Sequence, residues 1–584
     1  MMRIIYFILF FIAPVFCLSQ NLSQARKTNW TFAGINHVVV PPSSIVNIMS
    51  FGADATGVSP NDLALQSALA SLSGNAGIIL FPAGIFLFNS TISLPDSIVL
   101  RGGGSTATTL QFNLNGVGDL IRVAGSAQLT TGILLTNATK DSSFIELSNA
   151  ASFSTGDYIR LYQQNNTLVF SSWAYNTVGQ ILKVSSVTGN KVYFSSVLRK
   201  DYLLSDSCKI EKCTMRKSVG LECLKINRLD ASVGQTTNIA FDFAVDCWVT
   251  GVESNNCNFG HLVFTKSTNC YVYGNYFHDA FAYGGGGQAY GVVLQYTSGE
   301  CLIENNIFKH LRHSMLVQAG ANGNVCAFNY SLDPNWTSFP SNSAGDIVMH
   351  GNYVFMNLIE ENICQNIVVD ASHGINGPYN TFFRNRAELY GIIMSSNPTS
   401  DNQNYIGNEI TGTAFPYGNY TITGSGNFEF GNNKAGTCIP TNTNNITDIS
   451  YFYTAVPWFF TSASVYPSIG YNNTLNANSI PAKDRYASGN YTLCGNVLTS
   501  ENALSKNFSI SIFPNPASEF ISIETKSAGL FSYTVFNTAG KLICSGLLRT
   551  NLKLNLETFS AGVYFISVKN TDGELFSEKF VVLK

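Results

Sequence analysis

Five lines of similar sequence recur through the middle of the chain and constrain its fold more than any other feature. The lines begin at Cys247, Cys270, Cys301, Asn357 and Asn380. The step from the first line to the second is 23 residues, and the longer steps contain inserted loops. A repeat of this length cannot bury an apolar face alone, so neighbouring repeats must stack. The pattern predicts a parallel β-helix to which each line adds one coil.

Two columns of like residues appear when the lines are aligned. The sixth residue is Asn in four lines: Asn275, Asn306, Asn362 and Asn385. Stacked amides can bond to the coils above and below, so this column predicts an amide ladder at a turn. A second column holds Cys247, Cys270 and Cys301, with Cys326 as a further candidate. Stacked neighbours on parallel coils rarely have bridging geometry, so we expect buried thiols instead of disulfides.

Each line is followed by a second apolar strand, which ends in a polar residue. Aligned in this way, the polar residues are Thr265, Gln295, Gln318 and His350. Because side chains alternate between the two faces of a strand, these four residues are expected to form one outward column.

The charge balance excludes two classes of partner. The formal net charge is -3, and charged residues make up only 12% of the 584 residues. No basic patch is therefore expected for nucleic acid or for an acidic membrane surface.

The first residues predict secretion. Residues 1–20 begin with Met-Met-Arg and continue with the apolar run 4–13, which is the pattern of a signal peptide. The apolar run is too short to cross a membrane comfortably. We expect cleavage near residue 20 and no transmembrane segment after removal of the signal.

A compact set of motifs follows the signal peptide. Residues 47–57 read Asn-Ile-Met-Ser-Phe-Gly-Ala-Asp-Ala-Thr-Gly, and Asn61-Asp62 precede a helix with Leu65, Leu69 and Leu72 on one face. Residues 78–84 then read Ile-Ile-Leu-Phe-Pro-Ala-Gly. Such a helix can cover the exposed end of a stacked sheet, and Asn61 can cap it.

These motifs resemble the N-terminal cap of the pectate-lyase superfamily of right-handed parallel β-helix proteins. The resemblance implies a β-helix over residues 21–494. Within it, residues 140–235 are interpreted as an elaboration and residues 415–494 as a C-terminal cover. We expect a monomer, and Cys438 and Cys494 could pair within the cover.

The end of the chain has a different character. Residues 495–507 are interpreted as a linker, and residues 508–584 alternate apolar positions with Gly and Asn turns, which predicts a small antiparallel β-sandwich. This region resembles the C-terminal sorting domain of type IX secretion cargo in the Bacteroidetes. The resemblance implies that the type IX secretion machinery exports the protein to the cell surface or the medium and that the tail is removed.

Histidines gather in the repeat region, which holds six of the seven in the chain. With nearby charged residues they provide the candidate catalytic set, namely Lys309, His313, His350, His373, Asp346 and Asp370. Candidate substrate-binding residues are Gln295, Gln318, Arg312, Arg384, His310 and Tyr290. Lys309 and His278 share an offset on adjacent lines and should be neighbours.

The superfamily resemblance implies a polysaccharide substrate and leaves the reaction open. A lyase acting on a uronic acid needs a cation for the carboxylate, a base and an acid. A hydrolase needs two carboxylates at a set separation, for which Asp346 and Asp370 are the best pair. Acids are fewer than bases here, which favours β-elimination. A non-catalytic glycan-binding adhesin is a further alternative.

Two better-known subfamilies do not match. Polygalacturonase-like motifs are absent, with Ser372-His373-Gly374 as the nearest fragment, and Trp248-Val249-Thr250-Gly251 lacks the acid and histidine of true pectate lyases. Calcium would suit a lyase, but no acidic loop requires it, so the cofactor is left unknown and no metal ligand is assigned.

Overall fold

The computed structural model describes residues 22–37, 42, 44–130, 132–284, 286–335, 345–461, 463–494, 510–525, 531–537, 542–548, 551–570 and 575–584. The expected signal peptide (1–20) and linker (495–507) lie outside the described residues. Among the described residues, no helix is long and apolar enough to cross a membrane.

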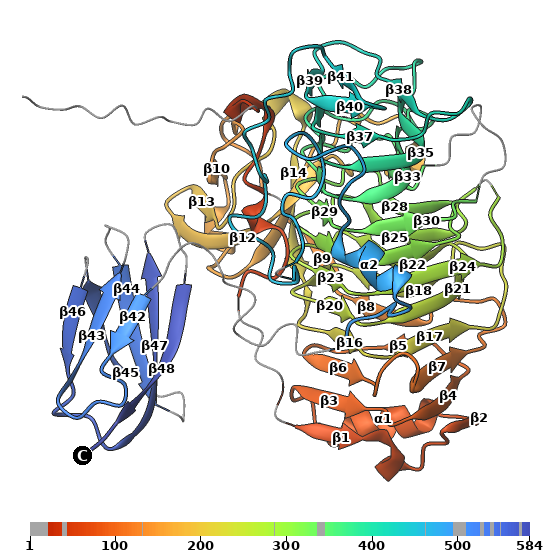
Figure 1. Cartoon of the computed structure of the whole chain (residues 1–584). Helices are drawn as coiled ribbons and strands as arrows, with labels where there is room; N and C mark the ends of the chain where they lie inside the picture. Colours follow the sequence, from red (N-terminus) through yellow and green to blue (C-terminus); the bar gives the residue numbers. More distant parts are fainter. Residues whose placement is uncertain are drawn as a thin grey trace, which may run out of the picture.

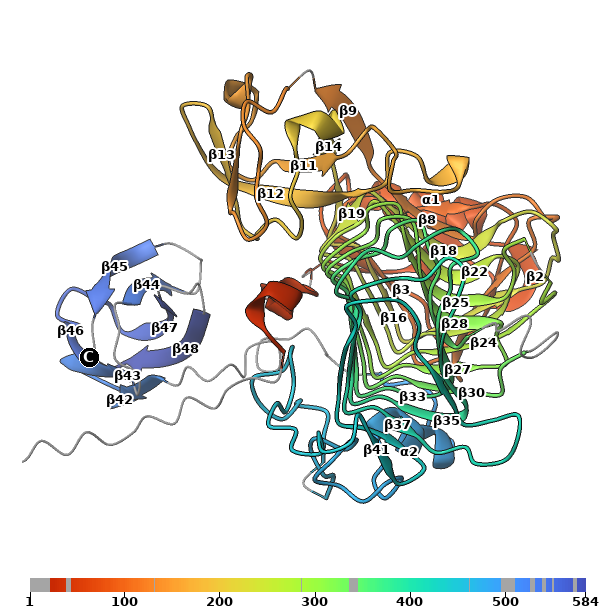
Figure 2. The ribbon, with the colours of Figure 1, turned by 90° about the horizontal axis from the view of Figure 1, so that it is seen from above.

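The body of the chain is a parallel β-helix with three ladders of strands (Figures 1 and 2). The first ladder consists of β1 Ile45–Asn47, β3 Gly77–Leu80, β6 Ile98–Arg101, β16 Gly220–Glu222, β20 Trp248–Thr250, β23 Tyr271–Tyr273, β26 Leu302–Glu304, β29 Val325–Ala327, β32 Leu358–Glu360, β34 Thr381–Phe383, β36 Asn404–Ile406 and β39 Phe428–Phe430.

The second and third ladders run along the other two sides of the coils. The second consists of β2 Thr56–Pro60, β4 Gly84–Phe88, β7 Thr108–Phe112, β17 Lys225–Arg228, β21 Glu253–Cys257, β24 Tyr276–Ala280, β27 Ile307–Lys309, β30 Tyr330–Leu332, β33 Ile363–Val369, β35 Arg386–Met394, β37 Glu409–Ile410 and β40 Asn432–Lys434, which β41 Thr437–Ile439 closes antiparallel. The third consists of β5 Ile92–Ser93, β8 Ile121–Ala124, β18 Thr237–Asp242, β22 Gly260–Thr265, β25 Tyr290–Gln295, β28 His313–Val317, β31 Ile347–Met349 and β38 Asn419–Thr421, with the ends of β33 and β35 between the last two. A minor pair joins β15 Arg216–Lys217 to β19 Ala244–Val245.

The predicted amide ladder exists and is longer than expected. Each Nδ2 donates to the Oδ1 of the next member at 2.9–3.0 Å along Asn275, Asn306, Asn329, Asn362, Asn385, Asn408 and Asn432. Each of the seven amides also donates to a backbone carbonyl of the preceding coil, as in the bond from Asn329 Nδ2 to Ile303 O at 2.8 Å. The ladder satisfies backbone groups at a turn that is sealed from water.

The thiol column is confirmed in part. Cys247, Cys270 and Cys301 are free, buried and aligned in register. Cys326 is buried but lies opposite Ile303, so its assignment to this column was wrong. Asn324 takes the next place and begins a second amide ladder, which continues through Asn357, Asn380 and Gln403 at 2.9–3.0 Å.

Helix α1, Asp62–Ser71, lies at the end of the stack beside the first strands (Figure 1). It packs Leu65 and Leu72 against the main core, and Leu69 is partly buried there. Asn61 occupies the N-cap position, but its side chain does not bond to the helix, because its Oδ1 accepts a hydrogen bond from Asp54 N at 2.6 Å. The expected covering helix is therefore present, whereas its side-chain cap is not.

The elaboration is an antiparallel sheet inserted between two coils. It consists of β9 Ser126–Thr130, β10 Phe144–Glu146, β11 Tyr158–Tyr162, β12 Gly179–Thr188, β13 Lys191–Phe194 and β14 Lys209–Thr214. We call this the inserted sheet. Its bounds differ from 140–235, because residues 216–242 already form coil strands. The buried Arg199 guanidinium bonds to Glu300 and, at 2.9 Å, to Asn322 Oδ1, which ties the sheet to the coils.

The C-terminal cover begins later than residue 415, because β38 to β41 still belong to the stack. After them, residues 442–461 and 463–494, here called the strap, run back across the first ladder and include helix α2, Pro481–Ala487. Ser450 bonds to Glu360, Tyr453 to Glu304 and Leu493 N to Gly274 O. Trp30 joins the same face through Nε1, 2.7 Å from Met356 O.

The expected pair of Cys438 and Cys494 does not form. Both thiols are free, and they lie near opposite ends of the strap. The Cys438 thiol donates to Pro440 O at 3.2 Å, whereas the Cys494 thiol approaches Gly251 O at 3.8 Å.

The C-terminal region is a sandwich of two antiparallel sheets, as expected. One sheet holds β42 Ile510–Phe513, β43 Phe520–Thr525 and β46 Asn551–Asn555. The other holds β44 Phe531–Asn537, β45 Leu542–Leu548, β47 Gly562–Asn570 and β48 Leu575–Val582. Apolar side chains from both sheets form one core.

The amide ladder gives a first prediction. Asn329→Ala removes the acceptor of both Asn306 amide groups and the donor to Ile303 O, leaving buried polar groups unpaired. We expect a loss of about 2–4 kcal/mol in the free energy of unfolding, measured by denaturant titration. The exposed Asn445→Ala is the matched control and should stay within about 0.5 kcal/mol. Equal unfolding midpoints for the two variants would contradict the stabilising role of Asn329 in the ladder.

The strap gives a second prediction, on pH. Burial raises the pKa of Glu304 and of Glu360 from 4.5 to about 7. Because the folded state holds these protons more tightly than the unfolded state, the two groups contribute most to stability below pH 4.5. This contribution is lost as the pH rises through about 7. Between pH 4.5 and about 7, the free energy of unfolding should fall less in the Glu304→Gln/Glu360→Gln double variant than in the parent. We expect a difference on the order of 1–3 kcal/mol per group, measured by denaturant titration at each pH. If the free energy of unfolding had the same pH dependence in the parent and the variant, the prediction would be refuted.

Candidate functional site

The outward column of the third ladder is assembled as the alternation predicts. Thr265 and Gln295 are register partners, and Gln318 and His350 follow on the next two coils. The amides link the column, because Gln318 Nε2 donates to Gln295 Oε1 at 2.7 Å and Gln295 Nε2 to Thr265 Oγ1 at 3.3 Å. Asp370 continues it, with its backbone N 2.8 Å from Met349 O.

His350 and Asp370 are in direct contact on adjacent coils. His350 Nδ1 lies 2.5 Å from Asp370 Oδ2. Burial alone would raise the pKa of Asp370, but the contact with His350 and two bonds from Ser372, both at 2.7 Å, lower it below its usual range. The carboxylate is therefore charged and holds one ring nitrogen of the histidine.

Two further histidines flank this pair. The ring centroids of His350 and His373 are 4.7 Å apart, and those of His350 and His313 are 5.8 Å apart. Burial, and then the neighbouring His350, lower the pKa of His313 to about 3 and also lower the pKa of His373. We call His313, His350, His373 and Asp370 the histidine cluster. Two of its rings are thus held neutral.

The inserted sheet supplies residues that sequence reasoning did not place in the site. Ser171 Oγ lies 3.2 Å from His373 Nδ1, and the Trp173 ring packs edge-on against His373 and Tyr296, at 5.2 and 6.1 Å between centroids. Asn352 Oδ1 accepts hydrogen bonds from the backbone N–H groups of Phe170 and Ser171 at 2.9 and 3.0 Å. These bonds hold residues 170–175, the part of the loop between β11 and β12 that we call the arm, in place. Trp173 is still 42% exposed. In the sequence, the only sign that this region contributes to the site was the isolated Trp173.

Tyr290 and Arg312 lie on the other side of the cluster. The Tyr290 and His313 rings are 4.9 Å apart, and the positive charge of Arg312 contributes to lowering the pKa of His313. Arg312 Nη1 donates to Gly284 O at 3.2 Å. The structure therefore brings together Gln295, Gln318, Tyr290, Arg312, His313, His350, Asp370 and His373.

Asp346 does not face this cluster, contrary to expectation. Its side chain is 0% exposed and accepts bonds from Gln365 N, at 2.5 Å, and from Ser331 inside the coil. Burial raises its pKa to about 6. The alternation breaks at a bend, so that Asp346 and the following Ile347 both point inward. The expected hydrolase pair of Asp346 and Asp370 is not formed.

Lys309 and His310 belong to a different edge of the coils. Lys309 is the register partner of His278 on the second ladder, which confirms their predicted proximity. His310 Nδ1 lies 3.2 Å from Asp333, and its ring packs on Tyr283 at 4.9 Å. Neither residue has a recorded contact with the histidine cluster among the described residues.

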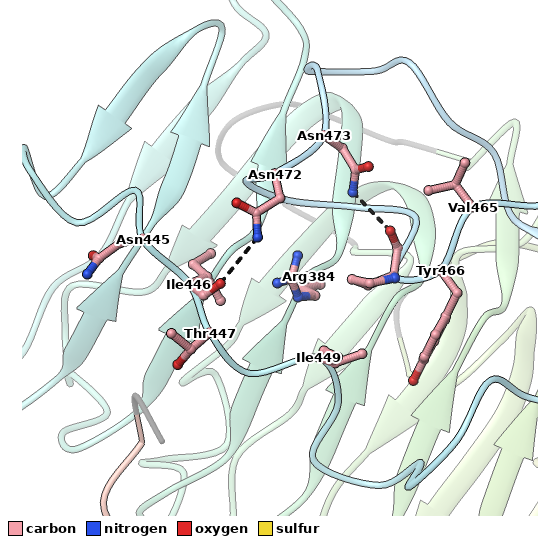
Figure 3. A pocket seen from close by; sticks show the side chains of 10 residues that line it. Arg384, Asn445, Ile446, Thr447, Ile449, Val465, Tyr466, Asn472 and Asn473 are labelled. Carbon is pink, nitrogen blue, oxygen red and sulfur yellow. Dashed lines mark hydrogen bonds between the residues drawn. The ribbon is translucent and has the colours of Figure 1, made fainter. Parts of the chain in front are cut away.

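Arg384 lies beneath the strap and was wrongly assigned to substrate binding. Its guanidinium donates to the backbone carbonyls of Asp448, Ile469 and Tyr471 at 2.7–3.3 Å, and the residue is 1% exposed. It borders a hollow of about 580 Å³ that strap residues enclose, including Ile446, Tyr466 and Asn472 (Figure 3). Arg384 therefore fastens the strap to the coils.

Metal binding has no geometric support in the part of the chain that is described. There, no group of three or more His, Cys, Asp or Glu side chains is placed to hold a metal ion.

Comparisons with known proteins agree with the two-part architecture. The family "Rhamnogalacturonase A/epimerase, pectate lyase-like" matches residues 45–194, and "Secretion system C-terminal sorting domain" matches residues 511–583. A capsule K1-specific depolymerase of Klebsiella phage K64-1 is 26% identical over 152 residues. The match spans 24% of this chain and 16% of that protein.

One solved structure shares the fold at low identity, and a second is similar at a lower TM-score. The tailspike gp61 of Pseudomonas phage phi297 aligns with a TM-score of 0.50 and 12% identity, covering 92% of this chain and 99% of its own. An exopolygalacturonase of Thermotoga maritima has a TM-score of 0.35 and 13% identity, over 64% of this chain and 85% of its own. Likeness at these identities concerns the fold alone. The chain is a parallel β-helix protein in which residues 45–194 match a pectate-lyase-like family, and its type IX secretion sorting domain shows that it is secreted or displayed at the cell surface.

Proposed function

We propose that the protein is a polysaccharide-degrading enzyme that cleaves a uronic-acid-containing polymer by β-elimination at the histidine cluster. The contact of His350 with Asp370 on the outward face carries the proposal. The similarity of part of the chain to a capsule depolymerase supports a polymeric substrate.

His350 is proposed as the base. Asp370 occupies Nδ1, so Nε2 is the nitrogen that can accept the proton next to the sugar carboxylate. The charged Asp370 orients the ring and stabilises the imidazolium formed after proton removal.

The remaining roles fall to neighbouring side chains. The Arg312 guanidinium can pair with the sugar carboxylate, while Gln295 and Gln318 offer amides for hydroxyl groups. Burial raises the pKa of Tyr296, which keeps its hydroxyl protonated and able to donate to the leaving oxygen. Trp173 presents an exposed ring on which a sugar can stack.

Hydrolysis is the second candidate, and the position of Asp346 weighs against it. A hydrolase of this kind needs two carboxylates that both reach the substrate. Asp370 can do so, whereas Asp346 is inside the coil.

The test is the full chain incubated with a panel of uronic-acid polymers, followed by ultraviolet absorbance and by reducing ends. Elimination produces both signals, because it creates a conjugated double bond and a new end. Reducing ends without absorbance would indicate hydrolysis. Silence of both signals, together with retained polymer binding, would indicate an adhesin.

A third prediction concerns the base. His350→Ala and Asp370→Asn should each lower kcat by about 10²–10⁴-fold while leaving the far-ultraviolet circular dichroism unchanged. His278→Ala is the matched control, since His278 also contacts carboxylates but lies on the second ladder. If all three variants lost activity to the same extent, the assignment of His350 as the base would be contradicted.

A fourth prediction concerns the aromatic arm. Trp173→Ala should raise KM about three- to tenfold with little change in kcat, because the ring contributes stacking and no proton transfer. Tyr175→Ala, on the same arm and 51% exposed, serves as the control with a smaller effect. A drop in kcat without a change in KM would assign Trp173 to positioning His373 instead.

A further inference from the structure

The end of the strap lies against an early coil of the β-helix. Leu493 N donates to Gly274 O at 2.8 Å, and the hydroxyls of Thr492 and Ser105 are 3.1 Å apart. Cys494 comes next and is exposed, with its sulfur 3.8 Å from Gly251 O. A β-carbon on Gly251 would lie 3.1 Å from this sulfur, so the thiol is seated tightly on that residue.

A second cysteine lies on the neighbouring coil at the same position. Glu222 and Thr250 are register partners, so Cys223 and Gly251 follow them side by side. The backbone of Cys223 is fixed on both sides, because its N–H bonds to Thr250 O at 3.0 Å and its carbonyl to Gly104 N at 2.8 Å. The two thiols are close enough for each to shift the pKa of the other, so that the pKa of Cys223 is raised and that of Cys494 is lowered.

We propose that Cys223 and Cys494 form a disulfide in the exported protein, which fastens the end of the strap to the β-helix. The cross-link joins residues 271 positions apart, counted as 494 minus 223. It sits immediately before the segment that leads to the sorting domain. A secreted or surface-displayed protein meets the oxidising surroundings in which disulfides persist.

The chemistry of the site suits thiol–disulfide exchange. The hydrogen bond from Cys223 lowers the pKa of Cys494, which favours the exposed thiolate as the attacking group. Cys494 attacks one sulfur of the disulfide of a protein thiol oxidant, which forms a mixed disulfide and releases the oxidant's other sulfur. Cys223 then attacks the sulfur of Cys494, so that the Cys223–Cys494 bond forms and the bond to the oxidant breaks. The two thiol protons and two electrons end on the oxidant, which leaves as a dithiol.

The other cysteines of the coils do not share these properties. Cys247, Cys270 and Cys301 are fully buried in the core column. Cys438, in β41 just before the strap, contacts Pro440 and Thr443. Among these cysteines, oxidation should therefore be confined to the pair Cys223 and Cys494.

The test uses the full chain exported to an oxidising periplasm, alkylated in denaturant without reductant and mapped by mass spectrometry. We expect a linked peptide pair containing Cys223 and Cys494, lighter than the two free peptides by two hydrogens. Alkylation of both thiols before reduction would overturn the proposal, as would a linkage of either thiol to a different cysteine.

A second measurement separates the cross-link from mere proximity. Reduction, or Cys494→Ser, should speed proteolytic cleavage within the strap by about tenfold or more, because the end of the strap can then detach. Cys438→Ser is the matched control and should retain the parental rate. Equal cleavage rates for Cys494→Ser, for the reduced protein and for the oxidised parent would also overturn the proposal.

Discussion

The structure depends on the register between successive coils, and buried amides fix that register. In a parallel stack, a slip of one residue would turn every inward side chain outward. The ladder from Asn275 to Asn432 opposes such a slip, because each amide bonds to its counterparts and to a backbone carbonyl. Everything placed on the outer face, including the contact of His350 with Asp370, inherits its spacing from this ladder.

The repeat could be predicted because each line carries the same residue at the same offset. The outward column from Thr265 to His350 followed from simple alternation and is present. Alternation failed for Asp346, because the chain bends before β31 and two successive side chains point inward. The alternation of inward and outward side chains along a strand does not show where the chain bends.

Contacts between distant segments were beyond the reach of sequence patterns. Ser171 meets His373 across 202 positions, and Arg384 meets Ile469 across 85. Ser171 and Ile469 lie outside the repeat, so no offset related them to His373 and Arg384. Arg384 looked like a substrate-binding residue because it sits in a polar, turn-rich line. Its burial beneath the strap shows that its guanidinium instead satisfies backbone carbonyls.

The position of the histidine cluster combines two structural parts. The third ladder supplies a regular row of side chains, and the inserted sheet brings Trp173 to one side of it. A flat row alone would offer contacts repeated at about 4.8 Å, which suits an extended polymer but does not select one bond for cleavage. The single contact of His350 with Asp370 breaks that repetition and marks one position along the row.

The most direct test of this account is the mass of the products formed in heavy-oxygen water. Elimination takes no oxygen from solvent, so the account predicts unlabelled products whose new non-reducing ends lack the mass of one water. Saturated products that carry the heavy oxygen would show hydrolysis and contradict the role assigned to His350.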